Sequence, residues 1–157
     1  MIGSLGQRNT NTAGSSMANK TAGTVYEYKF FSKILELGYD LFIPAGDNLP
    51  IDCIIQNGAG KLYKVQIKGT ASENSEGGRE ANRRRYKVLA ATGQSSKTSI
   101  DCTKVDILAA YVQPVDTWYI IPCLEIGAKS VWFYPHIENS RAMTEKYREK
   151  WDLFKYL

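Results

Sequence analysis

The stretch that decides the fold runs from Ile51 to Lys68 and reads IDCIIQNGAGKLYKVQIK. Two apolar, β-branched runs flank Asn57-Gly58-Ala59-Gly60, a cluster of turn-forming residues. This pattern predicts a β-hairpin with strands over 51–56 and 61–68. If the loop has an odd number of residues centred near Ala59, position 52 lies opposite position 66.

That register has a consequence for the polar side chains of the hairpin. Alternate residues of a strand share one face of a sheet, and opposed residues have Cβ atoms about 4.5–5.5 Å apart. Asp52, Gln66 and Lys68 are then expected together at the open end of the hairpin. Ile51 and Cys53 are expected to share the opposite face of the first strand. An even-numbered loop would turn Asp52 away from Gln66 and Lys68.

The rest of the chain predicts a helix, a series of strands and a second helix. The helix over 25–37 follows from the spacing of Phe30, Phe31, Ile34 and Leu37, with Gly38 to end it. Short strands are expected at 39–44, 86–91, 105–112, 118–121 and 131–134, and the turn at 113–116 predicts a second hairpin. Met143, Tyr147, Trp151 and Phe154 follow helical spacing and predict a terminal helix over 144–157. These elements indicate an α/β fold with one mixed or antiparallel sheet.

Length and composition indicate one domain, 21–157, preceded by a flexible polar arm, 1–20. With 43% hydrophobic and 23% charged residues the chain falls in the ordinary globular range. No apolar run approaches the ~20 residues of a membrane span, and the N-terminus has no signal-like apolar segment, so we expect a cytoplasmic protein. Cys53, Cys102 and Cys123 are odd in number and widely spaced, which favours free buried thiols over a disulfide or zinc site.

Positive charge is concentrated in the middle of the chain. Residues 61–104 hold ten Lys and Arg residues against four acidic ones, a net charge of +6, whereas the whole chain carries only +4. Within this segment Arg79, Arg83, Arg84, Arg85 and Lys87 can contact nucleic-acid phosphates, or they form an ordinary solvated surface.

The cluster at the open end of the hairpin suits phosphodiester hydrolysis. Asp52 and Gln66 can hold Mg²⁺ (Mn²⁺ is also possible) through oxygen atoms, and the backbone carbonyl of Ile67 can add a ligand. Lys68 can orient the attacking water or stabilise developing charge. Against this, the same residues fit a solvated strand face.

Glu27 adds a second carboxylate to the argument. It shares the apolar stripe of its helix, and an acid that faces a sheet calls for a metal or a polar partner. Thr24 and Glu27 also fit a helix capping box, which would explain Glu27 without any catalytic role.

Pro50-Ile51-Asp52 followed by Gln66-Ile67-Lys68 resembles the motif of the PD-(D/E)xK nuclease superfamily, which includes restriction enzymes, Holliday-junction resolvases and a group of homing endonucleases. Gln66 stands where most members carry Asp or Glu, and Glu27 matches a glutamate on the helix before the first catalytic strand. In length and layout the chain is most similar to compact group I intron homing endonucleases. The resemblance implies a restriction-endonuclease-like core, a mixed central sheet flanked by helices, with Glu27, Asp52, Gln66 and Lys68 as catalytic residues.

We therefore expect an Mg²⁺-dependent endonuclease that cuts duplex DNA. The alternatives are a Holliday-junction resolvase that acts on branched DNA, and a catalytically inactive DNA-binding module, for which the neutral Gln66 is the main argument. Cutting two strands with one site per chain favours a homodimer or homotetramer. The chain has no GxxxxGK[ST] phosphate loop, so no nucleotide cofactor is expected.

Overall fold

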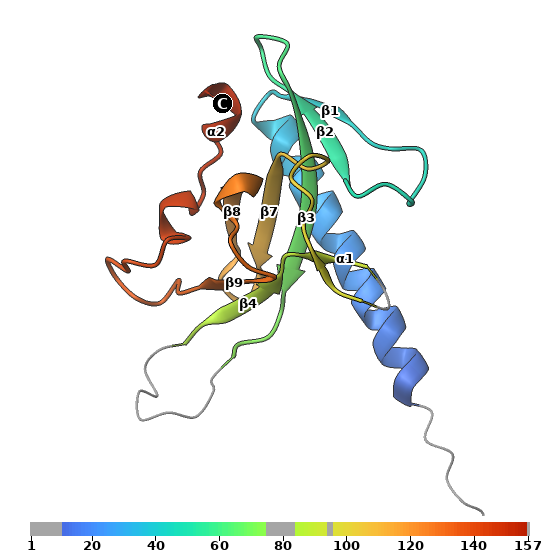
Figure 1. Ribbon diagram of the computed structural model, residues 1–157, viewed down its shortest axis with the longest axis vertical. Coiled ribbons are helices and arrows are strands. Elements are labelled where there is room, and N and C mark those ends of the chain that lie inside the picture. The colour runs from blue at the N-terminus through green and yellow to red at the C-terminus, as the bar shows by residue number, and fades with distance from the viewer. Residues whose placement is uncertain (1–10, 75–83, 94–95, 157) are drawn as a thin grey trace, which may run out of the picture.

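A computed structural model describes residues 11–74, 84–93 and 96–156, with side chains from residue 18 onward. A central mixed sheet is backed by one long helix, and the N-terminal part of that helix projects away from the sheet (Figure 1). The elements in chain order are α1 (Asn11–Glu36), β1 (Asp40–Phe42), β2 (Cys53–Gln56), β3 (Leu62–Thr70), β4 (Tyr86–Leu89), β5 (Ala91–Thr92), β6 (Thr98–Ser99), β7 (Ile107–Val112), η1 (Gln113–Val115), β8 (Thr117–Pro122), η2 (Cys123–Glu125), β9 (Ser130–Phe133), η3 (Glu145–Tyr147) and α2 (Leu153–Tyr156).

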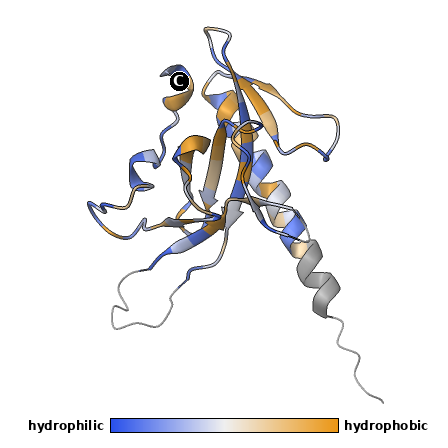
Figure 2. Ribbon diagram, in the orientation of Figure 1, coloured by the Kyte–Doolittle hydropathy of each residue, from blue (hydrophilic) through white to orange (hydrophobic). Residues whose placement is uncertain are grey.

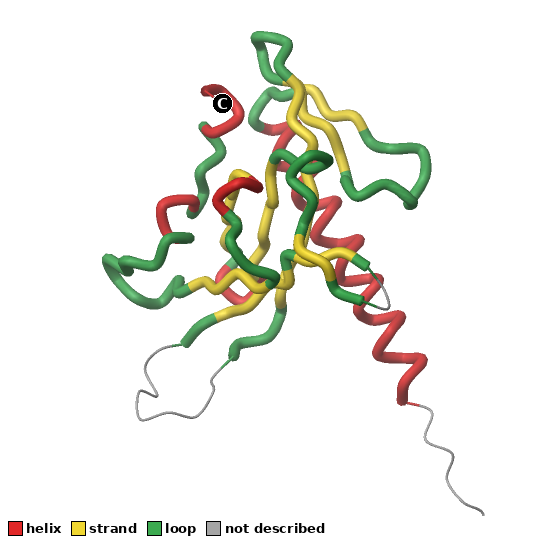
Figure 3. Tube along the Cα trace, viewed as in Figure 1, coloured by secondary structure: helices red, strands yellow, loops and turns green. Residues whose placement is uncertain are grey.

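The main sheet has the strand order β1-β2-β3-β7-β8. β3 and β7 run parallel, and the other neighbouring pairs are antiparallel, so the predicted α/β fold with a mixed central sheet is confirmed. Two smaller pairings, β4 with β9 and β5 with β6, lie outside the main sheet (Figure 3). Both predicted hairpins are present, as β2–β3 and β7–β8.

Apolar side chains cover both faces of the main sheet, and Figure 2 shows the apolar colour of its strand β7. β7 is buried at every position, as expected for a strand with both faces covered. On one face the cluster includes Phe30 and Ile34 of α1. On the other face it includes Tyr86 and Phe133 of the β4–β9 pair.

The register of the first hairpin is the predicted one. Cys53 pairs with Val65 and Ile54 with Lys64, the register in which one further regular residue would set position 52 opposite position 66. The buried Asn57 fixes this register from the turn. Its Oδ1 accepts hydrogen bonds from the backbone N–H groups of Ala59 and Lys61, both at 3.0 Å. Its Nδ2 donates to the backbone oxygen of Phe154 at 2.9 Å, which ties the turn to α2.

Two expectations about helices are wrong. α1 begins at Asn11, well before the predicted start, so the expected arm overlaps the helix, and Leu37 lies beyond its end and is 40% exposed. The C-terminal stretch is not one helix: η3 and α2 are separated by Glu149, which has a left-handed φ of 49° and donates its N–H to the Trp118 oxygen at 2.8 Å. A continuous helix cannot pass through such a residue.

The four apolar residues of that stretch are consequently divided. Met143 is exposed, Tyr147 packs into the cluster beneath β4 and β9, and Trp151 and Phe154 pack into the cluster beneath α1.

The expectation of three free thiols is also wrong. Cys102 and Cys123 form a disulfide across a sequence separation of 21 residues, and only Cys53 is a free, buried thiol. The two bonded cysteines come together because they flank the β7–β8 hairpin, one before its first strand and one after its second. No helix in the described parts of the chain is long and apolar enough to cross a membrane.

Replacing Asn57 by Ala tests the role of the turn. The change removes the acceptor of two backbone N–H groups and the donor to Phe154, and it leaves buried polar groups unsatisfied. We expect the free energy of unfolding in urea to fall by about 2–3 kcal/mol. Asn48→Ala, at an exposed loop position, should change it by less than about 0.5 kcal/mol. Equal effects of the two substitutions would contradict this role.

Candidate active site

The candidate site forms where β2 separates from β3. Pairing joins residues 53–56 to 62–65, so β3 continues beyond its partner from Gln66 to Thr70. The chain bends at Asp52, whose backbone N–H donates to the Val65 oxygen at 2.8 Å. Its Oδ2 accepts the N–H of Ile67 at 2.6 Å. If β2 continued, one of its backbone carbonyls would accept the Ile67 N–H. The Asp52 carboxylate accepts it instead and lies on the free edge of β3.

The same edge exposes a main-chain oxygen. The N–H and C=O of one residue in a strand point to the same side, since paired residues exchange both hydrogen bonds. Because the Ile67 N–H points at Asp52, the Ile67 carbonyl points to the same free edge. A carboxylate oxygen and a backbone oxygen thus share this edge.

The bend at Asp52 corrects one detail of the predicted pleat. Ile51 packs against the cluster on the β4–β9 side of the sheet, whereas Cys53 lies in the cluster beneath α1, so the two do not share a side as expected. Alternation fails there because regular β2 pairing begins only at Cys53. As a result the Asp52 carboxylate is directed along the sheet edge.

Gln66 is buried, so the alternative explanation of an ordinary solvated strand face does not apply to it. Its side chain is only 6% exposed. Its Oε1 is fully buried and has no hydrogen-bond partner among the residues that the structure describes. An unsatisfied buried amide oxygen costs on the order of 1–3 kcal/mol. A cation at the site would supply the missing partner.

Helix α1 brings Glu27 to this edge. The buried side chains of Phe30 and Ile34 hold the helix on the sheet. Tyr26, the neighbour of Glu27, packs so closely on Gly69 that a Cβ added to Gly69 would lie 2.4 Å from its ring. The Tyr26 hydroxyl also donates to Oε1 of Gln113 at 2.8 Å. These contacts fix the turn of α1 that carries Glu27 above the end of β3.

The capping explanation of Glu27 is wrong. Thr24 lies inside α1, which begins at Asn11, and its hydroxyl donates to the backbone oxygen of Lys20 at 3.2 Å. No helix starts at Thr24, so Glu27 has no N-terminal N–H groups to cap.

Electrostatics connect Glu27, Asp52 and Lys68. Burial raises the pKa of Asp52 above its ordinary value, against the lowering effects of the Ile67 hydrogen bond and of Lys68. Burial also raises the pKa of Glu27, the negative charge of Asp52 raises it further, and Lys68 lowers it. Within the described part of the chain, two partly desolvated carboxylates therefore face the single ammonium group of Lys68. A divalent cation would relieve their mutual repulsion.

The oxygen donors at the site fit a hard cation. The described residues contain no convergent set of three His, Cys, Asp or Glu side chains. What the site offers is two carboxylates and the Ile67 carbonyl, the oxygen chemistry that Mg²⁺ and Mn²⁺ prefer, and Gln66, the residue before Ile67, carries a buried amide oxygen. The Cys53 thiol is no ligand for such an ion, because burial raises its pKa and keeps it neutral.

A pocket of about 580 Å³ opens beside the two carboxylates. Glu27 and Asp52 line it together with the loop that joins β1 to β2, including Asp47. Both carboxylates are thus accessible to a substrate.

The basic residues predicted to bind DNA are only partly described. Arg79 and Arg83 lie outside the described residues. Arg84 pairs with Glu73, with Nε and Oε2 separated by 2.7 Å. Arg85, which directly precedes β4, and Lys87 of β4 lie over the ring of Trp132.

The match to known families agrees with this geometry. Residues 17–154 match the sequence profile of the PD-(D/E)XK endonuclease family. The chain belongs to this family. Membership assigns it a nuclease function and confirms the relationship that the Asp52, Gln66 and Lys68 motif predicted.

A solved structure of a bacterial homing endonuclease, I-Ssp6803I, has the same fold. It superposes with a TM-score of 0.69 at 20% sequence identity, over 87% of this chain and 93% of that one. This likeness confirms the predicted restriction-endonuclease-like core. No curated protein matches the chain.

The close contact between Tyr26 and Gly69 is a feature that our sequence analysis missed. A glycine inside a strand, directly after Lys68, was the available signal for a close approach. Gly69→Ala should displace the Tyr26 ring and lower the free energy of unfolding by about 1–3 kcal/mol. Gly58→Ala, where an added Cβ meets nothing within 4 Å, is the matched control and should leave it within about 0.5 kcal/mol. Equal stability of the two variants would contradict the contact.

The raised pKa of Asp52 predicts a change in stability with pH. A carboxyl group whose pKa is higher in the folded state favours folding below its unfolded pKa, and this contribution is lost as pH rises through the folded pKa. In metal-free protein, Asp52→Asn should therefore raise the free energy of unfolding at pH 8, by about 1 kcal/mol for each unit of pKa difference, with little gain near pH 4. Asn retains an oxygen that can accept the Ile67 N–H.

Urea unfolding in EDTA at both pH values measures this difference, with Asp40→Asn at an exposed position of β1 as the control. Added Mg²⁺ should then stabilise the wild type more than Asp52→Asn, because a ligand that binds the folded state stabilises it. A loss of stability in Asp52→Asn at pH 8 without metal would contradict the prediction.

Proposed function

We propose that the chain is a metal-dependent endonuclease that hydrolyses phosphodiester bonds in duplex DNA with Mg²⁺, or with Mn²⁺ in its place. The observation that carries the proposal is the free edge of β3. There the Asp52 carboxylate is held on the Ile67 N–H, and the preceding residue of β3, Gln66, has a buried side-chain oxygen without a hydrogen-bond partner among the described residues. Lys68 follows on the same strand, within electrostatic reach of Asp52 and Glu27.

Asp52, Gln66 and the backbone carbonyl of Ile67 would hold the cation, and Glu27 would complete the site directly or through water. When bound, a divalent ion neutralises phosphate charge and acidifies a coordinated water. The protein's own task is to position the oxygen donors. The hydrogen bond to Ile67 fixes Asp52, the contact of Tyr26 with Gly69 fixes α1, and burial fixes Gln66.

Lys68 and Glu27 would act on the attacking water and the phosphate. The Lys68 ammonium donates hydrogen bonds to the water oxygen or to a non-bridging phosphate oxygen, where negative charge builds up in the transition state. The Glu27 carboxylate accepts a proton from the attacking water, whose oxygen forms the new bond to phosphorus while the bond from phosphorus to the 3′ oxygen breaks. The leaving 3′ oxygen takes up a proton from solvent.

Substrate geometry supports an assembly of several chains. The strands of a duplex are antiparallel, and each chain offers one such site, so cutting both strands would use a homodimer or homotetramer with two-fold symmetry. The likeness to I-Ssp6803I supports a homing-endonuclease-like reaction on linear duplex over the resolution of branched DNA. Access to such a substrate would place the protein in the cytoplasm.

A plasmid-nicking assay with Mg²⁺ tests the proposal. Wild-type protein should nick and linearise plasmid DNA, and Lys68→Ala should be slower by about 10²–10³-fold, because one donor to the transition-state charge is lost. Lys64→Ala is the matched control, since Lys64 lies on the same strand and its ammonium is occupied by the Thr103 oxygen at 3.0 Å. Its rate should stay within about 3-fold of the wild type.

Three outcomes would contradict the proposal. Equal cleavage by Lys68→Ala and wild type would exclude the assigned role of Lys68. DNA binding by the wild type without cleavage in either Mg²⁺ or Mn²⁺ would support an inactive binding module. Preference for a four-way junction over linear duplex would favour a resolvase.

A further inference from the structure

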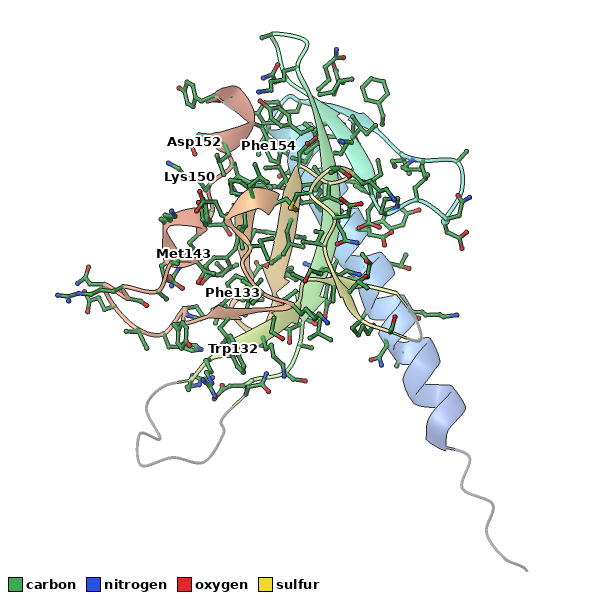
Figure 4. All side chains as sticks on the ribbon, in the orientation of Figure 1. Trp132, Phe133, Met143, Lys150, Asp152 and Phe154 are labelled. Atoms are coloured by element: carbon green, nitrogen blue, oxygen red, sulfur yellow. A yellow bond between two sulfur atoms is a disulfide. The ribbon has the colours of Figure 1, made fainter. Side chains whose placement is uncertain are left out.

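The β4–β9 pair forms a ribbon with two chemically different faces. Tyr86 and Val88 pair with Phe133 and Val131, and all four side chains are buried against the sheet. The residues between them point outward, where Lys87 lies opposite Trp132. Trp132 and Phe133 are neighbours on β9 (Figure 4), and only Trp132 is partly exposed.

Two cations are held on the exposed ring. Cζ of Arg85 lies 4.2 Å from the centroid of the Trp132 ring, and Nζ of Lys87 lies 5.4 Å from it. A stacked guanidinium uses its planar face for the ring, and its N–H donors lie at the edge of that plane. Among the described residues of this outward face, Arg85, Lys87, Leu89, Ser130 and Trp132, none carries a negative charge.

Arg84 differs from its two basic neighbours. Its guanidinium is paired with Glu73 at 2.7 Å, at the base of the loop that links β3 to β4. This pair closes the base of the loop, so Arg84 has a structural role there, whereas Arg85 and Lys87 are the basic residues described on the outward face of the ribbon.

The ribbon is attached directly to the strand that carries the candidate site. Beyond β3, Glu73 forms a bridge with Tyr86, and the N–H of Asn74 donates to the Arg85 oxygen at 2.8 Å. Arg85 is therefore level with Asn74, six residues past Lys68 along the chain. At about 3.3 Å per residue this is at most about 20 Å. A duplex that occupies the site spans such a distance in about six base pairs.

We propose that the outward face of the β4–β9 ribbon binds the sugar-phosphate backbone of the duplex that occupies the site. Arg85 and Lys87 contact phosphates, and Trp132 is the positioning residue that holds both cations in place. This inference rests on the proposed function for its substrate, and it adds Trp132 to the functional residues. Phosphate contacts position a duplex without reading its sequence, so the binding that they supply depends on salt and not on sequence.

Binding of a fluorescently labelled random-sequence 30-base-pair duplex, measured by anisotropy in EDTA between 50 and 200 mM NaCl, tests this surface apart from cleavage. Lys87→Ala should weaken binding and reduce the slope of log affinity against log salt by about one. Trp132→Leu changes no charge, yet it should weaken binding roughly 3–10-fold by releasing both cations. Trp132→Phe, which keeps an aromatic ring, should fall between Trp132→Leu and the wild type.

Lys61→Ala is the matched control. Its Nζ lies 5.5 Å from the centroid of the Tyr63 ring, so it also removes a lysine on an aromatic ring, but at the β2–β3 turn, at the other end of the molecule from the ribbon (Figure 1). It should change affinity by less than about 2-fold. Thermal unfolding checks each variant, and if Trp132→Leu does not fold, Lys87→Ala and Trp132→Phe decide the question.

The proposal is overturned if Lys87→Ala has the same DNA affinity and salt slope as Lys61→Ala. It is also overturned if Trp132→Leu folds and binds DNA like the wild type. Its failure is distinguishable from that of the hydrolytic function. A wild type that cleaves, with ribbon variants that bind normally, overturns only the ribbon. A wild type that binds through the ribbon without cleaving DNA in Mg²⁺ overturns only the hydrolysis.

Discussion

The candidate site depends on one hydrogen bond, from the Ile67 N–H to the Asp52 carboxylate at 2.6 Å. A continued β2 would satisfy that N–H with a backbone carbonyl and would cover the edge of β3 beyond Val65. The bend at Asp52 ends the pairing and, in the same step, puts a carboxylate on the edge that it uncovers. The same bend therefore ends the β2–β3 pairing and forms the site. The position of the Asp52 carboxylate is set by backbone geometry.

The electrostatics of the site work against the stability of the metal-free fold. Burial raises the pKa of both Asp52 and Glu27, so each carboxylate is less favourable as an anion here than in water. A carboxylate at position 66, which is only 6% exposed, would add a third negative charge in a more buried place. Gln66 keeps an oxygen donor there without that charge. This explains how the chain can depart from the usual acidic residue and still offer oxygen ligands.

Local sequence patterns predicted the structural features that depend on residues close in sequence. They failed for features that depend on contacts between segments far apart in the chain. The turn Asn57-Gly58-Ala59-Gly60 specified the register of β2 on β3, because turn chemistry is local. The spacing of Tyr147, Trp151 and Phe154 has helical periodicity. A hydrogen bond from the Glu149 N–H to the Trp118 oxygen of β8 nevertheless keeps the segment from forming one continuous helix. The Cys102–Cys123 disulfide depends in the same way on β7–β8 pairing. Glu27 was placed correctly on a helix whose early start at Asn11 no apolar pattern marks.

β3 connects the two surfaces that would meet DNA, because the candidate site lies on its free edge and the ribbon bridges to the chain just beyond it. Their separation is at most about 20 Å, the length of six fully extended residues. About six base pairs is little more than half a helical turn, over which a duplex presents one side to the protein. A single chain would thus follow one strand near its scissile bond, and the other strand would meet the equivalent groups of a second copy related by a two-fold axis.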